Sequence, residues 1–350
     1  MKVQRSKKKV LIISNFLSRA GFNRSVCEDF AERLHEAGWT VITTSSKHAP
    51  IPRLFDMMAT VWRERYKYVF AQVDVFSGPS FMWAEAVCGL LRKLHKPIVL
   101  TLHGGNLPQF ARHWPGRVRH LLAFASAVTT PSRYLLEAMQ PYRSDIRLIP
   151  NPIDLRAYPF RHRVNPKPRF IWLRAFHAIY NPTMAPRILA ELIHDFPDAL
   201  LIMIGPDKGD GSFKSTQSVV ESMNLNERVQ FPGRVPKSSI PYWLNQGDVF
   251  INTTNVDNTP VSVLEAMSCG LCVVSTDVGG IPYLLEHEQD ALLVPPDDPR
   301  AMASAVRRIL TESNIASRLS SNARREAEKY NWDIVLPQWE LLLQEIINFD

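Results

Sequence analysis

Long apolar runs are missing from this sequence of 350 residues, and no run approaches the roughly 20 residues that span a bilayer. The basic start resembles a signal peptide, but its apolar part is only residues 10–13, so a first buried strand is the better interpretation. Hydrophobic residues make up 45% of the chain and charged residues 21%, as is usual for globular proteins. We therefore expect a cytoplasmic protein with one long domain or two medium ones.

Cysteine is scarce, with four residues: Cys27, Cys88, Cys269 and Cys272. Cys269 and Cys272 form a C-x-x-C pair, which could indicate redox chemistry or half of a zinc site. No second pair lies at zinc-ribbon spacing, and the pair straddles a predicted helix end and strand start. Packed, reduced thiols are the better interpretation, and they suit a reducing cytoplasm.

The formal charge of +7 comes with clusters of basic residues. They are Arg112, His113, Arg117, Arg119 and His120 on one predicted helix, and Arg161, His162 and Arg163 further on. No nucleic-acid-binding module accompanies them, so we expect no nucleic-acid partner. An anionic membrane surface and an anionic acceptor fit equally well, and a solvated basic face is the default.

Strand-like and helix-like segments alternate through both halves of the chain. Predicted strands are residues 10–14, 40–44, 73–77, 98–102, 127–130, 146–149, 170–173, 199–204, 229–231, 249–254, 272–275 and 292–294. Predicted helices include residues 25–37, 51–68, 81–94, 133–140, 315–330 and 332–349. This alternation predicts an α/β protein with parallel sheets, whose site lies in the loops at the carboxyl ends of the strands.

Residues 255–280 hold the most informative stretch. Thr259 can cap a helix that has Pro260 at its first position and ends at Gly270. The start of this helix offers free N–H groups at Val261 and Ser262 together with the positive end of a dipole, which is a phosphate site.

Two carboxylates flank that helix start. Asp257 precedes the cap, and Glu265 lies about one turn into the helix. Both could accept hydrogen bonds from sugar or ribose hydroxyls beside a bound diphosphate. Alternatively, they merely complement the helix dipole, since acidic residues are common near helix starts.

This stretch resembles the family 4 retaining glycosyltransferases of the GT-B fold, the "glycosyl transferases group 1" type. The resemblance rests on an acid, seven residues and then Glu265-Ala-Met, followed by a Gly-Gly-Ile-Pro turn at 279–282. It implies that Asp257 faces the donor sugar and that Glu265 holds the nucleotide ribose. The chain has Asp257 where the family usually has Glu, and Thr259-Pro260 where Phe-Gly is common, so one backbone donor is missing.

The resemblance also implies roles outside the motif. His103, which precedes Gly104-Gly105 at a predicted strand end, would lie near the reacting sugar, although a packed loop histidine is the alternative. Arg174 would bind the donor diphosphate, and Lys208, in the loop that begins at Gly205, would replace a lysine that the family carries after the arginine. Gly21 retains part of the family's acceptor-side glycine loop.

The implied architecture is two Rossmann-like domains whose parallel sheets face a central cleft. The stiff segment 150–154 resembles the family's linker, which puts an acceptor-side domain at 1–155 and a nucleotide-sugar domain at 156–330. The last helix, 331–350, would cross back to the N-terminal domain.

We therefore predict a hexosyltransferase that moves a sugar from a UDP- or GDP-sugar to a hydroxyl of a glycan, lipid-linked or small-molecule acceptor. No Asp-x-Asp loop or His/carboxylate cluster occurs, so we expect neither a metal nor a permanently bound cofactor. Any contact with an anionic membrane would be peripheral and carried by the basic residues from Arg112 to His120. A GT-B nucleotide-sugar epimerase and a non-catalytic GT-B scaffold are the alternatives.

Overall fold

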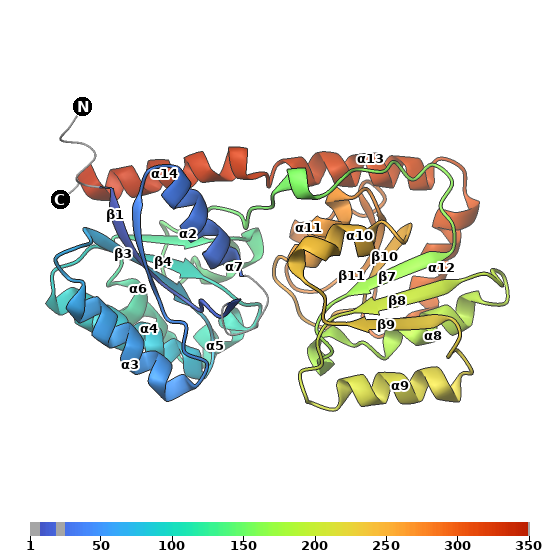
Figure 1. Cartoon of the computed structure of the whole chain (residues 1–350), viewed down its shortest axis with the longest axis horizontal. Helices are drawn as coiled ribbons and strands as arrows, with labels where there is room; N and C mark the ends of the chain where they lie inside the picture. Colours follow the sequence, from blue (N-terminus) through green and yellow to red (C-terminus); the bar gives the residue numbers. More distant parts are fainter. Residues whose placement is uncertain (1–7, 19–24, 349–350) are drawn as a thin grey trace. The chain divides into compact units, whose positions relative to one another are not determined.

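A computed structural model describes residues 8–18 and 25–348 of the chain. These residues fall into two compact units, Met1–Pro152 with Trp332–Asp350, and Ile153–Asn331. Each unit holds one six-stranded parallel sheet with helices on both faces (Figure 1). The predicted α/β class with two Rossmann-like sheets is therefore confirmed.

The sheet of the first unit has the strand order β2-β1-β3-β4-β5-β6. Its strands are β1 (Lys9–Ile13), β2 (Thr40–Thr44), β3 (Phe70–Val75), β4 (Ile98–Leu102), β5 (Ala127–Thr130) and β6 (Arg147–Leu148). Most are short apolar runs that are buried on both faces, as is usual for parallel sheets. The order reverses between β1 and β3, which is where ligands tend to bind in open α/β sheets.

Two layers of helices cover this sheet. The helices are α2 (Val26–Glu36), α3 (Pro50–Arg63), α4 (Pro79–Lys93), α5 (Leu107–His113), α6 (Pro115–Leu122), α7 (Arg133–Met139) and α14 (Trp332–Asn348). Helices α2 and α14 cover one face, where Phe30 and Trp339 pack with ring centroids 4.7 Å apart. Helices α3 to α7 pack on the other face. The single basic helix predicted around 112–120 is wrong: it is split into α5 and α6, because Pro115 cannot continue a helix.

The sheet of the second unit has the order β12-β11-β10-β7-β8-β9. Its strands are β7 (Arg169–Leu173), β8 (Leu200–Ile204), β9 (Val229–Gly233), β10 (Val249–Asn252), β11 (Cys272–Thr276) and β12 (Ala291–Val294). Its helices are α8 (Met184–Leu192), α9 (Ser212–Ser222), α10 (Ile240–Leu244), α11 (Val261–Ser268), α12 (Pro299–Thr311) and α13 (Ile315–Glu328). Short 3₁₀ turns are η2 (Leu155–Ala157), η3 (Ala178–Tyr180), η4 (Lys237–Ser239) and η5 (Ile281–Tyr283). The strand order reverses between β7 and β10, which directs attention to the loops after these two strands.

The basic segment 161–163 combines two exposed residues, Arg161 and His162, with a buried one, so only Arg163 departs from the solvated face that the sequence predicts. Arg163 is 2% exposed and donates to the Gly247 carbonyl at 3.1 Å. Arg161 forms an ion pair with Asp248 at 2.5 Å, and His162 contacts the Ser317 carbonyl at 3.1 Å. These contacts hold the segment against the second unit, because a buried guanidinium needs carbonyl and carboxylate partners.

The four cysteines are free, as the sequence predicts, and Cys269 and Cys272 are buried without a disulfide. Burial raises the pKa of each of the four thiols to about 12, which keeps them protonated and unreactive at neutral pH.

Among the described residues, no helix is long and apolar enough to cross a membrane.

Candidate active site

The switch point of the second sheet positions Arg174. This residue follows β7 directly, and its N–H donates to the Ile204 carbonyl at 3.0 Å. Gly205 comes next to Ile204, with φ +152°, and a Cβ atom there would collide with the Arg174 carbonyl. Only glycine permits so close an approach, so Gly205 allows its backbone to pack directly against that of Arg174.

The Arg174 guanidinium is nearly buried between an acid and an aromatic ring. It forms an ion pair with the Asp257 carboxylate and lies 4.5 Å from the centroid of the Tyr180 ring. Burial lowers the pKa of Arg174 to about 10, partly offset by the nearby Glu265 carboxylate, so the group is still a cation at neutral pH. Within the described chain, its Nε has no hydrogen-bond partner. A buried cation with an unused donor is suited to an anionic ligand.

Tyr180 stands in the region where the sequence lacks the family's lysine. Its segment is fixed to the loop after β10, since the Thr253 hydroxyl donates to the Tyr180 carbonyl at 2.8 Å and accepts from the Trp172 indole at 2.9 Å. The aromatic ring therefore orients Arg174 by cation–π contact and adds no charge. Sequence reasoning missed this role.

The Gly279-Gly280 turn holds the loop that carries Asp257. The Gly280 N–H donates to the Asp257 carbonyl at 3.0 Å. A Cβ at Gly279, whose φ is +55°, would collide with that carbonyl, and one at Gly280 would collide with the Asn258 carbonyl. Both glycines are therefore needed for the loop to pass, and the loop sets the place of the carboxylate.

Helix α11 begins at Val261, and its N-cap is Pro260. The predicted cap at Thr259 is therefore wrong by one residue: Pro260 has the extended ψ of 115° typical of a cap, and no side chain caps the helix. Its hydrogen bonds start with the Val263 N–H, which donates to the Pro260 carbonyl at 3.1 Å. The N–H groups of Val261 and Ser262 precede that bond and form the positive end of the helix dipole.

Ser262 adds a hydroxyl to this helix start. Its Oγ is buried and has no hydrogen-bond partner in the described part of the chain. Buried polar atoms are nearly always satisfied in native proteins, so an unsatisfied hydroxyl at the start of α11 is suited to an external hydrogen-bond partner. The residues present thus fit a diphosphate.

Glu265 is 7% exposed and accepts a hydrogen bond of 2.6 Å from the Tyr158 hydroxyl. Tyr158 lies just after η2, more than 100 residues earlier in the chain. Sequence reasoning missed it, because a lone tyrosine in a proline-rich connection carries no local signal. The pair leaves two interpretations of Glu265, a ribose ligand or a structural partner of Tyr158.

The remaining predicted donor residues are less central. Lys208 is exposed, and its backbone N–H donates a hydrogen bond to the Phe176 carbonyl at 3.2 Å. Gly21 lies outside the described residues. In those residues, no group of three or more His, Cys, Asp or Glu side chains is placed to hold a metal ion.

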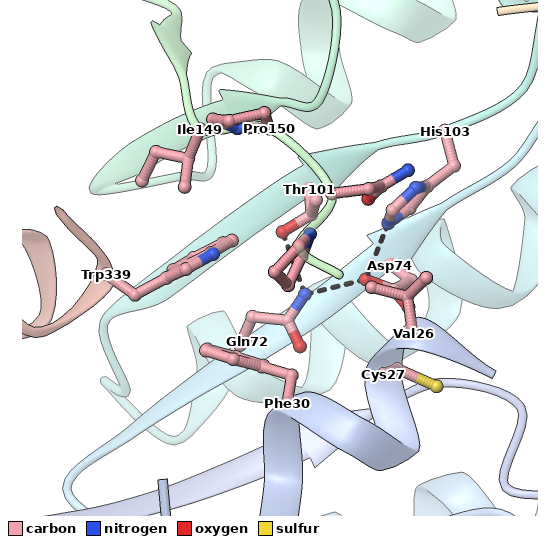
Figure 2. A pocket seen from close by; sticks show the side chains of 12 residues that line it. Val26, Cys27, Phe30, Gln72, Asp74, Thr101, His103, Ile149, Pro150 and Trp339 are labelled. Carbon is pink, nitrogen blue, oxygen red and sulfur yellow. Dashed lines mark hydrogen bonds and ion pairs between the residues drawn. The ribbon is translucent and has the colours of Figure 1, made fainter. Parts of the chain in front are cut away.

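His103 belongs to the first unit, directly after β4. Its Nε2 lies 3.0 Å from Oδ1 of Asp74, and its ring stacks on Phe76 with centroids 5.2 Å apart. Figure 2 shows Asp74 and His103 along one wall of a pocket that is also lined by Phe30 and Trp339.

Asp74 is the centre of a polar network that sequence reasoning missed. The Gln72 amide donates to it at 2.7 Å and to Thr101 at 2.8 Å, and the Ser14 hydroxyl also donates to it. Burial alone raises the pKa of Asp74, but the charge and hydrogen bond of His103 and the bonds from Ser14 and Gln72 outweigh it and bring the pKa below its ordinary value. The carboxylate therefore stays ionised and holds the imidazole in place.

Comparisons with known proteins agree with this architecture. The fold is that of the sucrose-phosphate synthase from Thermosynechococcus elongatus, with a TM-score of 0.82 and 18% identity over 98% of this chain and 100% of that one. Anabaena HepE in complex with UDP and glucose gives 0.77 and 17% over 96% and 99%. These likenesses show that the chain has the GT-B fold.

Two family models identify the family. One, described as Glycosyltransferase Family 4, matches residues 10–157, and the other, described as Glycosyl transferases group 1, matches residues 170–312. Between them they match the greater part of both units. The chain belongs to the family 4 glycosyltransferases of the GT-B fold, as its motif predicts.

Curated relatives are distant. The N-acetyl-alpha-D-glucosaminyl L-malate synthase of Bacillus anthracis is 23% identical over 289 residues, which are 76% of this chain and 73% of that protein. The D-inositol 3-phosphate glycosyltransferase of Jonesia denitrificans is 25% identical over 156 residues, which are 43% of this chain and 37% of that protein. The second match therefore spans little more than a third of its relative, and neither relative fixes the substrates of this chain.

Proposed function

We propose that this protein transfers a hexose from a nucleotide-sugar donor to an acceptor hydroxyl, with retention of the anomeric configuration. One observation supports the donor site most directly: the buried, ionised Arg174 at the end of β7 has an unused Nε donor, and the Ser262 hydroxyl at the start of α11 is unsatisfied as well. A diphosphate would satisfy both groups at the switch point of the second sheet.

Arg174 and the N–H groups of Val261 and Ser262 would carry the leaving diphosphate. Negative charge grows on this group as the sugar–phosphate bond breaks, and donors that are already in place stabilise it without reorganisation. This arrangement needs no metal, and transfer should therefore continue in EDTA. Activity that EDTA abolishes and only Mg²⁺ or Mn²⁺ restores would contradict this part of the proposal.

Glu265 would hold the ribose, and Asp257 would bind hydroxyls of the donor sugar. We assign neither carboxylate the role of a nucleophile that forms a covalent intermediate. The acceptor oxygen would bond to the anomeric carbon on the face that the diphosphate leaves, and its proton would pass to the departing phosphate oxygen. The role predicted for His103 at the reacting sugar, and that of Lys208 at the diphosphate, stay predictions.

Assays with nucleotide sugars and acceptors identify the donor base and the acceptor. UDP-sugars should be examined first, because the Anabaena neighbour holds UDP, with GDP-sugars next. The acceptor could be a glycan, a lipid-linked molecule or a small molecule. We also propose a cytoplasmic location with peripheral contact to the inner face of the membrane.

A thermal-shift panel of UDP- and GDP-sugars tests the donor site. A ligand at about 100 times its dissociation constant adds roughly 2.7 kcal/mol to the stability, which is a readily measured shift. Arg174→Gln is the matched variant and should lose the shift. A sugar that stabilises the protein is then offered with acceptor hydroxyls, and the anomer of the product is read by NMR.

Each alternative activity predicts a different outcome. Conversion of the donor without an acceptor would indicate an epimerase. Binding of the donor with no conversion across a broad acceptor panel would indicate a scaffold. A product of inverted configuration would contradict retention while leaving the donor site intact.

A further inference from the structure

Helix α3 carries apolar side chains on the side that faces away from its own core. Val61 is fully buried toward the sheet. On the opposite side, Ile51 and Phe55 are each 70% exposed, Trp62 is 54% exposed and Tyr66, in the turn after the helix, is 85% exposed. Spacings of four and seven residues place Ile51, Phe55 and Trp62 along one line of the helix surface. Tyr66 adjoins this line, because the Arg65 guanidinium lies 4.4 Å from the ring centroids of both Trp62 and Tyr66. We call these four residues the α3 stripe.

Such a stripe is unusual for a surface helix, which normally has polar residues opposite its core. The half-buried Met58 lies within the same line. Among the described residues of the first unit, the other exposed large apolar side chains, Met82, Trp114, Ile334 and Leu341, are spread over other elements. Apolar residues that gather on one exposed line indicate an interaction surface.

Charge at the end of the helix is mostly positive. Arg63 and Lys67 share one acid, Glu64, at 2.9 and 2.8 Å. Within the described part of the chain, Arg65 has no ion pair, and its guanidinium lies 4.4 Å from the ring centroids of both Trp62 and Tyr66. Three cations therefore stand beside the stripe against a single carboxylate.

The other acid of the helix points away from the stripe. Asp56 accepts a hydrogen bond of 2.5 Å from the Ser45 hydroxyl and is half-buried. Figure 1 shows α3 on the outer surface of its unit, where the face opposite the sheet is open to solvent. The exposed side of α3 thus combines apolar and aromatic side chains with a basic end.

We propose that the α3 stripe rests on the surface of an anionic lipid bilayer. An amphipathic helix with bulky apolar residues on one line and cations beside it binds the membrane interface by burying the apolar side chains among the acyl chains, while the cations meet the headgroups. Trp62 and Tyr66 are of the residue types enriched at that interface. The formal charge of +7 favours an anionic surface over a second copy of the chain.

This surface differs from the basic residues between Arg112 and His120. There, Arg117 is paired with Glu85 at 2.6 Å, and Trp114 is a single exposed aromatic side chain. The proposal about α3 does not depend on the proposed sugar transfer, because it concerns binding to lipid alone.

Cosedimentation with vesicles tests the proposal. The full chain is mixed with phosphatidylcholine vesicles that contain or lack phosphatidylglycerol, at low and at high salt. We expect binding to the anionic vesicles that weakens as salt rises, since exposed charges are screened over about 10 Å at 0.1 M. The variant Ile51→Ser/Phe55→Ser/Trp62→Ser should bind at least about tenfold more weakly, because one buried apolar side chain alone is worth roughly that factor.

Matched controls separate this surface from general effects. Tyr242→Ser/Leu341→Ser changes side chains that are 63% and 61% exposed on other helices and should bind vesicles like the wild type. Arg63→Gln/Lys67→Gln should weaken binding at low salt, whereas Arg112→Gln/Arg119→Gln should not. Thermal unfolding should show that every variant is folded, because all of these side chains are exposed.

Three results would overturn the proposal. The first is a wild-type protein that does not sediment with anionic vesicles at low salt. The second is an unchanged affinity in the triple variant of the stripe. The third is a dimer, seen by light scattering, that the same triple variant dissociates, which would make the stripe a contact between two copies.

Discussion

The substitution Glu265→Gln separates a ribose-binding carboxylate from a structural one. The side chain is 7% exposed on α11 and accepts the Tyr158 hydroxyl at 2.6 Å. Glutamine has nearly the same volume and keeps a carbonyl oxygen for that bond. The change therefore removes the negative charge and leaves the packing in place.

The expected magnitudes follow from the loss of charge. A hydrogen bond to a charged group contributes about 1.5–3 kcal/mol and a neutral one about 0.5–1.5 kcal/mol, so the variant should lose about 1–1.5 kcal/mol of stability through Tyr158. If Glu265 also accepts the ribose hydroxyls, nucleoside diphosphate binding loses a charge-assisted bond. That loss weakens the affinity on the order of 10- to 150-fold.

Tyr158→Phe is the control, because it removes the intramolecular bond, which Glu265→Gln only weakens, and leaves the carboxylate untouched. Both variants are unfolded with urea and titrated with UDP and GDP by calorimetry. We expect a loss of stability in both, larger in Tyr158→Phe at about 1.5–3 kcal/mol, and a loss of affinity in Glu265→Gln alone. Equal and small changes in affinity would refute the ribose role and leave Glu265 as the partner of Tyr158.

Three further predictions concern the second unit and use Gly89 as a control from the first. Gly280→Ala should cost about 1–3 kcal/mol of stability and lower turnover, because the new methyl group collides with the Asn258 carbonyl. The control Gly89→Ala adds its methyl group in open space within α4 and should stabilise the protein by about 0.5–1 kcal/mol. Thermal unfolding and transfer kinetics test both. Burial raises the pKa of Asp290 to about 6, above its unfolded value of about 3.9, so the stability that the protonated carboxyl contributes is present at low pH and lost as pH rises through 6. Relative to wild type, the free energy of unfolding of Asp290→Asn should therefore rise by up to about 3 kcal/mol between pH 4 and 7. Urea unfolding over this pH range that shows no such rise would contradict the prediction. Asp257→Asn should change diphosphate affinity by less than about threefold, under 1 kcal/mol, while turnover falls, as calorimetry and a transfer assay would show.

The strands were the most predictable part of the structure. Strands β2, β4 and β5 match their predicted ranges, since each is a short run rich in apolar and β-branched residues between polar or turn-forming segments. Strand β3 begins three residues and ends two residues before its predicted range. Gln72 and Asp74 interrupt its apolar pattern, and both belong to the buried network that holds His103. The apolar pattern therefore mispredicted the strand where buried polar side chains take the place of apolar ones.

Long-range pairing explains what else the sequence could not predict. The motif pointed to Asp257 and Glu265, and the family resemblance to Arg174. However, the ion pair of Arg174 joins the ends of two different strands, and Tyr158 reaches Glu265 across 107 positions. No local pattern encodes such contacts. The burial of Arg163 was missed for the same reason, because its partners, the Gly247 carbonyl and Asp248, lie far along the chain.

The ion pair between Arg174 and Asp257 has a consequence for the proposed donor site. Removing either charge from a nearly buried pair leaves the other uncompensated, so the pair balances the site while no donor is bound. A diphosphate brings negative charge to Arg174 and to the start of α11, and it takes over part of the carboxylate's role there. Asp257 then becomes available to the hydroxyls of the sugar at the moment the diphosphate arrives. On this account the pair couples the two halves of the donor, and it explains why Asp257→Asn should spare diphosphate affinity: the loss of a competing anion offsets the loss of a residue that orients Arg174.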